Sequence, residues 1–203
     1  MLVYITCILF ALMFLFLLQI DMAFSQTLSE NETGGYIMSG TINSILPQSN
    51  ATWIIDGEWF MTTEMGQFKS FLALMIFISD DGLNQVTHEL VDFNLTSIAG
   101  SRDLALNLGL DNLIEQTELG NSSLSADDTT LLLQGIANIG TEGTISWLNV
   151  PTNIYIGNGT SIVIELDNES TDNYFENSPI YGLINLITPC VSSTSQTADL
   201  PTC

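Results

Sequence analysis

The chain has 203 residues, and only 2 of them are Lys or Arg against 23 Asp and Glu, which gives a formal net charge of −21. Charged residues are 12% of the chain, about half of the usual ~25%, so the charge comes from missing bases. Such a chain cannot neutralise phosphates, which excludes nucleic acid as a partner. An anionic membrane surface should repel it for the same reason.

The first eighteen residues, MLVYITCILFALMFLFLL, are almost all apolar, and Ala23 and Ser25 follow with the spacing of a cleavage site. This pattern predicts a signal peptide over residues 1–25 and a mature chain that begins at Gln26. The segment has no Lys or Arg and approaches the roughly 20 residues of a spanning helix, so an uncleaved membrane anchor is the alternative. Either form places the rest outside the cytoplasm, secreted or on the extracellular face of the cell envelope.

Two further features fit export. Cys7 leaves with the signal peptide, so the mature chain keeps two cysteines, Cys190 and Cys203. An even pair outside the cytoplasm predicts a disulfide between them, which would tether the Ser/Thr-rich tail over residues 190–203. Six N-x-S/T sequons, most of them at expected turns or strand ends, indicate a glycosylated surface protein. Their asparagines are Asn31, Asn50, Asn94, Asn121, Asn158 and Asn168.

Residues 34–189 provide one domain, and its clearest local signal is the stretch TWIIDGEWFMT. There Trp53, Ile55, Trp59 and Met61 share one face, as in a half-buried strand, and Gly57 indicates a bulge or a close backbone approach. The next segment, FKSFLALMIFIS, is apolar on both faces, which predicts a central strand covered on each side. The turn residues DDG follow it.

Further β-like runs are QVTHELVDF, TTLLLQGIANI, GTISWLNV, TNIYI, SIVIELD and IYGLINLI, with an Asn-Gly hairpin turn in IGNGTS. Residues 98–128 fit two patterns: Leu104 to Leu110 alternate, whereas Leu110, Leu113 and Ile114 have helical spacing. We favour a strand followed by a short helix. About eight strands with closely spaced turns predict an all-β fold, a single antiparallel β-sandwich or jelly-roll-like domain.

His88 is the only histidine of the chain, and it lies on an expected strand where Val86, Leu90 and Asp92 share its face. A histidine between Val and Leu is most often a partly buried residue that hydrogen-bonds to backbone or carboxylate. Every Ser-His-Asp set would have to include His88, yet the sequence has no nucleophile elbow. We therefore expect no enzymatic activity and no cofactor.

A divalent metal site is the alternative role for His88. The stretch DNESTDN gathers acidic and amide side chains in a short segment, and hard cations such as calcium prefer these oxygens. A weakly bound divalent cation is the most that we expect. The candidate ligands are His88, Asp92, Asp167, Glu169 and Asp172.

Four stretches, SGTI, TWIIDGEWFM, DDGLNQVTHELVDF and IELDNESTDNYFENSPIYG, resemble a group of small secreted β-rich proteins of ammonia-oxidising archaea. In that group an H-x-H pair on one strand, joined by a histidine before a late Phe, implies a copper-like site. Val86 and Tyr174 stand at two of those positions here, so only His88 matches. The resemblance implies an archaeal envelope protein whose metal set is incomplete.

The sequence thus favours an exported, acidic, glycosylated protein that acts as a non-enzymatic binding or structural module of the cell envelope. An envelope protein or a glycan is the expected partner, and the membrane is contacted only through an uncleaved N-terminal segment. The first alternative is a divalent-metal-binding extracellular protein that uses His88 and carboxylates. The second is a carbohydrate-binding or carbohydrate-active domain that uses the face of Trp53 and Trp59.

Overall fold

The computed structural model describes residues 34–48, 51–115, 124–125 and 129–190. The chain divides into two units, Met1–Thr33 and Gly34–Cys203, and all described residues belong to the second. Strands dominate this unit, so the predicted all-β class is confirmed. Among the described residues, none of the helices has the length and apolar character needed to cross a membrane.

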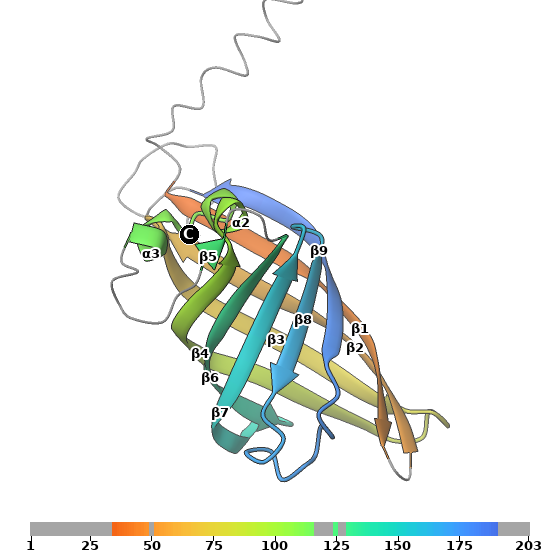
Figure 1. Ribbon diagram of the computed structural model, residues 1–203. Coiled ribbons are helices and arrows are strands. Elements are labelled where there is room, and N and C mark those ends of the chain that lie inside the picture. Colours follow the sequence, from red (N-terminus) through yellow and green to blue (C-terminus); the bar gives the residue numbers. More distant parts are fainter. Residues whose placement is uncertain (1–33, 49–50, 116–123, 126–128, 191–203) are drawn as a thin grey trace, which may run out of the picture. The chain divides into compact units, whose positions relative to one another are not determined.

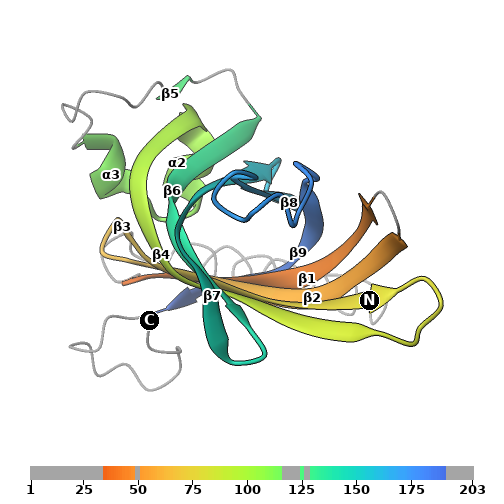
Figure 2. The ribbon, with the colours of Figure 1, turned by 90° about the horizontal axis from the view of Figure 1, so that it is seen from below.

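Eight antiparallel strands form one sheet, which Figure 1 shows with the elements labelled. They are joined in the order β3-β2-β1-β9-β8-β7-β6-β4, and β3 pairs with β4 as well as with β2. In Figure 2, β6 and β8 lie across from β1 and β2. The strands are β1 (Gly35–Gln48), β2 (Ala51–Glu64), β3 (Gln67–Ser79), β4 (Gln85–Ser101), β6 (Thr130–Thr141), β7 (Thr144–Gly157), β8 (Ser161–Leu166) and β9 (Ile180–Cys190).

Three short elements complete the described unit. The two-residue strand β5 (Leu124–Ser125) pairs in parallel with the end of β4. Helices α2 (Arg102–Asn107) and α3 (Asp111–Glu115) follow β4. The strand expected over Leu104 to Leu110 is therefore wrong, whereas the short helix after it is confirmed. The Ser101 side chain caps α2 by accepting a hydrogen bond from the Leu104 backbone N–H at 3.2 Å, a signal that outweighs the leucine alternation.

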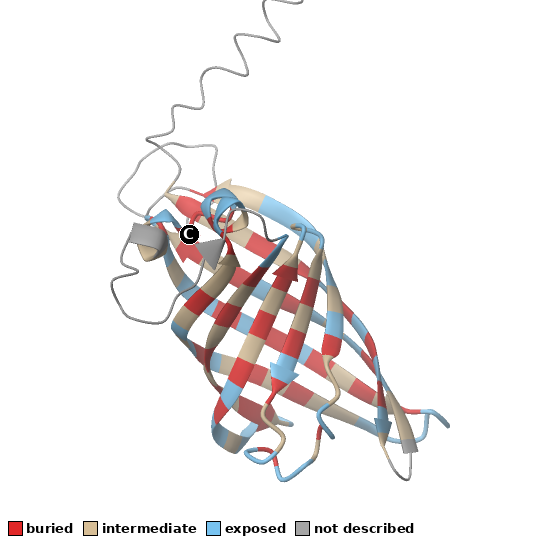
Figure 3. Cartoon of the chain, in the orientation of Figure 1, coloured by how far each residue is buried: buried red, intermediate tan, exposed pale blue. Residues whose placement is uncertain are grey.

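Alternate side chains of the strands enter one core, visible as banded burial in Figure 3. In β2, Ile55, Trp59 and Met61 are at most 1% exposed, whereas Ile54 and Phe60 are 46% and 42% exposed. The predicted alternation of β2 is confirmed. It follows from the two-residue period of a strand, which turns successive side chains to opposite faces.

Gly57 allows a neighbouring strand to come close. A Cβ atom at this position would lie 2.0 Å from the carbonyl oxygen of Leu74 in β3. The pairing of β2 with β3 runs through Gly57 without a shift in register. Of the two predicted reasons for this glycine, the close backbone approach is therefore the one that the structure confirms.

The prediction that β3 is covered on both faces is wrong. Phe71, Met75 and Phe77 are buried in the core, but Leu72 and Leu74 on the other face are 44% and 40% exposed. Leu72 and Leu74 are therefore open to solvent. A run of apolar residues is therefore compatible with a strand that is buried on one side only.

His88 and Leu90 share one face of β4 as predicted, but Asp92 does not, because a bulge follows Leu90. Its register with β6 shifts between Val91 and Asn94, and Asp92 has a φ of 53°. The bulge turns Phe93 into the core, where it is 5% exposed, and leaves Asp92 outside. One extra residue in a strand reverses the alternation that follows it.

The later hairpins largely follow the sequence. Asn158 and Gly159 have φ values of 48° and 65°, as the predicted Asn-Gly turn between β7 and β8 requires. The runs GTISWLNV and TNIYI, expected as separate strands, form the single strand β7. Asn149 lies in its middle with a φ of 55°, and the pairing with β6 shifts register nearby.

Candidate functional site

His88 is enclosed in the core, with 1% of its surface exposed. Its Nδ1 atom lies 3.1 Å from the Thr141 hydroxyl, and its Nε2 atom lies 3.0 Å from the Tyr174 hydroxyl. The Ser146 hydroxyl in turn donates to the Thr141 hydroxyl at 2.7 Å. Both ring nitrogens therefore have hydroxyl partners, and the histidine is more deeply buried than the sequence suggested.

Aromatic rings surround the imidazole. Its centroid lies 4.8 Å from that of Phe77, 5.1 Å from Tyr174, 5.8 Å from Phe175 and 6.0 Å from Trp147. Burial lowers the pKa of His88, and the Gly140 backbone and the Glu142 charge oppose this effect. Burial also raises the pKa of Tyr174. The group of His88, Phe77, Trp147, Tyr174 and Phe175, which we call the histidine cluster, is thus suited to a neutral imidazole.

The structure does not assemble the five predicted metal ligands. Asp92 accepts a hydrogen bond from the Asn138 amide at 3.1 Å, and Asp172 accepts one from the Trp147 indole at 3.2 Å. Asp167 accepts from the Ser170 hydroxyl and backbone N–H, which lower its pKa, and Glu169 is exposed. Within the described ranges, no three His, Cys, Asp or Glu residues are grouped so that they could hold a metal ion.

The segment between β8 and β9, residues 167–179, links the histidine cluster to the surface. It contributes Tyr174 and Phe175 to the cluster. The same segment contributes Asp167, Asn177 and Ser178 to the wall of a groove. The segment that hydrogen-bonds to His88 through Tyr174 therefore also forms part of a surface site.

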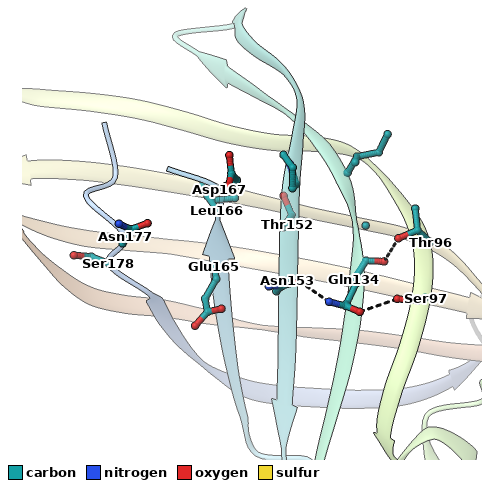
Figure 4. A pocket seen from close by; sticks show the side chains of 13 residues that line it. Thr96, Ser97, Gln134, Thr152, Asn153, Glu165, Leu166, Asp167, Asn177 and Ser178 are labelled. Atoms are coloured by element: carbon teal, nitrogen blue, oxygen red, sulfur yellow. Dashed lines mark hydrogen bonds between the residues drawn. The ribbon is translucent and has the colours of Figure 1, made fainter. Parts of the chain in front are cut away.

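That groove has a volume of about 620 Å³, within the range of ligand sites, about 300–1,000 Å³. It lies over β4, β6, β7 and β8 and is the site drawn in Figure 4. Amide, hydroxyl and carboxylate groups dominate its surface, and we call it the polar groove. Its lining residues are Thr96, Ser97, Gln134, Gly135, Ile136, Pro151, Thr152, Asn153, Glu165, Leu166, Asp167, Asn177 and Ser178.

A row of polar side chains crosses the polar groove at one level of the sheet. Ser97 pairs with Gln134, Gln134 with Asn153, and Asn153 with Glu165 on neighbouring strands. The Ser97 hydroxyl donates to Gln134 Oε1 at 2.9 Å, and Gln134 Nε2 donates to Asn153 Oδ1 at 3.3 Å, as Figure 4 shows. The row is therefore ordered before any ligand binds, which reduces the entropy that binding would cost.

Several polar groups of the groove point to solvent without a protein partner. Among the described residues, nothing accepts a hydrogen bond from Asn153 Nδ2, and nothing bonds to the side chains of Asn177 and Ser178. Burial raises the pKa of Tyr155, and the Glu165 carboxylate adds to this effect. Donors and acceptors are thus both available to a ligand.

The sequence did not single out this row. Gln134 and Asn153 are polar positions within otherwise apolar strands, which is the one local signal that they carry. Their alignment depends on which strands pair and in which register. The tryptophan face proposed for carbohydrate binding lies elsewhere, since Trp59 is 0% exposed and its indole donates to the Leu183 carbonyl oxygen at 3.1 Å.

The predicted modification sites fall in different surroundings. Asn94 and Asn158 are exposed, whereas Asn168 is half-buried and donates to Asn173. Cys190 is buried and disulfide-bonded. The other predicted residues, Asn31, Asn50, Asn121 and Cys203, lie outside the described residues.

Comparison with known proteins gives no relative from which a role could be transferred. No protein-family model, no curated protein and no solved structure matches the chain.

Proposed function

We propose that this chain is an exported, acidic and glycosylated module of the cell envelope that binds a ligand in its polar groove without catalysis. The observation that carries the proposal is the ordered row of Ser97, Gln134, Asn153 and Glu165 across four strands. The apolar N-terminal run and the sequons support export. The only histidine is enclosed in the histidine cluster and does not line the groove.

The chemistry of the groove fits a neutral, hydroxyl-rich ligand such as a glycan. Amide and carboxylate side chains hydrogen-bond to ligand hydroxyls as donors and acceptors. Ile136 and Pro151, which pair across β6 and β7, add an apolar area on which the C–H face of a sugar ring can rest. The net charge of −21 opposes anionic ligands.

The test is a titration of the full secreted chain with neutral, anionic and cationic oligosaccharides, followed by NMR or calorimetry. We expect neutral oligosaccharides to bind and Asn153→Ala to weaken binding by about tenfold, the loss of one or two hydrogen bonds. The matched control is Asn43→Ala, since Asn43 is exposed on β1 outside the groove. Equal binding by both variants would contradict the proposal, and binding only with added calcium would favour the divalent-cation alternative.

We also infer that the eight strands form one sheet closed on itself, in place of the two stacked sheets of a sandwich. The pairing of β3 with β4, from Ala73 opposite Leu90 to Ile78 opposite Gln85, supports this arrangement. Closure would explain how a single sheet encloses a core from all sides without exposed strand edges.

A further inference from the structure

The outer face of β1, β2, β3 and β9 exposes an unusual number of large apolar side chains. Each of the six residues named below is between 40% and 62% exposed. Monomeric soluble proteins rarely leave large contiguous apolar patches in water. We call this surface the outer apolar face, formed by Ile45, Ile54, Phe60, Leu72, Leu74 and Leu183.

This face is continuous along β3, since Ile76 and Ile78 follow Leu72 and Leu74 on it and Ile78 lies opposite Ile54. Phe60 of β2 lies opposite Leu72 of β3, and Ile45 of β1 lies opposite Ile54 of β2. Leu74 of β3 lies two residues from Leu72 and therefore on the same face. The apolar side chains of β1, β2 and β3 thus meet across adjacent strands. Leu183 of β9 lies opposite Thr41 of β1 and marks the edge of this face.

Carboxylates lie within this apolar surface. Asp56 and Glu58 are exposed on the same side of β2, and Glu58 lies opposite Leu74. In the described part of the chain, the salt bridge between Lys69 and Glu64 is the only one, so no base neutralises Asp56 or Glu58. The face therefore combines apolar side chains with unneutralised negative charge.

We propose that the outer apolar face binds a basic amphipathic segment of a protein partner, with apolar side chains on the leucines and Lys or Arg opposite Asp56 and Glu58. Charge complementarity selects this occupant. A second copy of the chain would bring the same carboxylates against its own, and the whole sequence holds only two bases to offset them. Arginine fits such a place well, because its apolar stem packs while its guanidinium pairs with carboxylate.

The test uses three synthetic 18-residue amphipathic peptides: one of Leu and Lys, one with Glu replacing Lys, and one with Ser replacing Leu. Their affinity for the full secreted chain is measured by fluorescence anisotropy at physiological ionic strength. Two altered proteins change the face, the double variant Leu72→Ser/Leu74→Ser and the conservative variant Glu58→Gln. The matched controls are Leu83→Ser and Asp103→Asn, which change an exposed leucine and an exposed acid outside the face.

We expect the Leu/Lys peptide to bind most tightly and each face variant to weaken it about tenfold or more, as truncation of a central contact does. The two controls should bind as the unaltered chain does. Equal affinity for all variants, or for the Leu/Glu peptide, would overturn the proposal. So would a dimer, detected by sedimentation, that Leu72→Ser/Leu74→Ser dissolves, or binding to zwitterionic lipid vesicles that the same variant abolishes.

Discussion

The Nε2 atom of His88 lies 3.0 Å from the hydroxyl of Tyr174, although 86 positions separate the two residues in the chain. This hydrogen bond joins β4 to the segment that connects β8 with β9. The segment also lines the polar groove through Asp167, Asn177 and Ser178. One segment of the chain thus contributes both to a buried contact in the core and to the wall of the surface site.

Replacing His88 should cost more stability than a partly buried residue would. His88→Ala removes two hydrogen bonds and leaves a cavity among aromatic rings, so we expect a loss of about 2–4 kcal/mol in the free energy of unfolding. This exceeds the loss of about 1 kcal/mol that is ordinary for one partly buried hydrogen bond. Urea denaturation measures the difference.

Tyr174→Phe is the matched control, because it removes one hydroxyl and keeps the ring. We expect a loss of about 1 kcal/mol in the free energy of unfolding.

Elemental analysis of the purified protein and of His88→Ala should give the same metal content. A stoichiometric metal ion that is present in the unaltered chain and absent from His88→Ala would contradict a purely structural role for this histidine.

Stability should fall as the solution becomes mildly acidic. Burial holds the pKa of folded His88 below its ordinary value of 6.5. Below about pH 6.5 the unfolded chain therefore takes up a proton that the folded chain does not, so the free energy of unfolding decreases from there down to the folded pKa and is unaffected above. Urea midpoints between about pH 7.5 and pH 5.5 should show this slope, and His88→Gln should reduce it.

The disulfide of Cys190 should be formed with Cys203. Cys190 is buried at the end of β9 and is disulfide-bonded. Peptide mapping under non-reducing conditions should recover the two residues in one linked fragment. Because the tail is poor in apolar residues, Cys203→Ser should cost less than the roughly 3 kcal/mol of the loop-entropy model. A fragment that links Cys190 to Cys7 would disprove both this pairing and the removal of the signal peptide.

Glycan occupancy should follow the accessibility of the asparagine side chains. Asn158 is exposed in a turn, whereas Asn168 donates to the Asn173 side chain at 2.6 Å and accepts from the Asn177 backbone N–H. We expect glycopeptide mass spectrometry of protein from its native host to find Asn158 modified and Asn168 largely unmodified. The reverse pattern would show that modification precedes folding of this segment.

The sequence by itself determined the local features of the fold. The alternation in β2 predicted which side chains enter the core, and the Asn-Gly pair predicted the turn at Asn158. Both depend on neighbouring residues alone, since the two-residue period of a strand and the left-handed backbone of the turn are local properties. The all-β class followed from the same patterns.

Tertiary structure alone decided which of those strands meet. The bulge after Leu90 turned Asp92 off the face that carries His88, and the register of β6 with β7 aligned Gln134 with Asn153. The tertiary structure also left Leu72 and Leu74, on the second apolar face of β3, exposed to solvent. Pairing and register are fixed by the packing of the whole core, because a shift of one residue would turn every side chain of a strand to the opposite face.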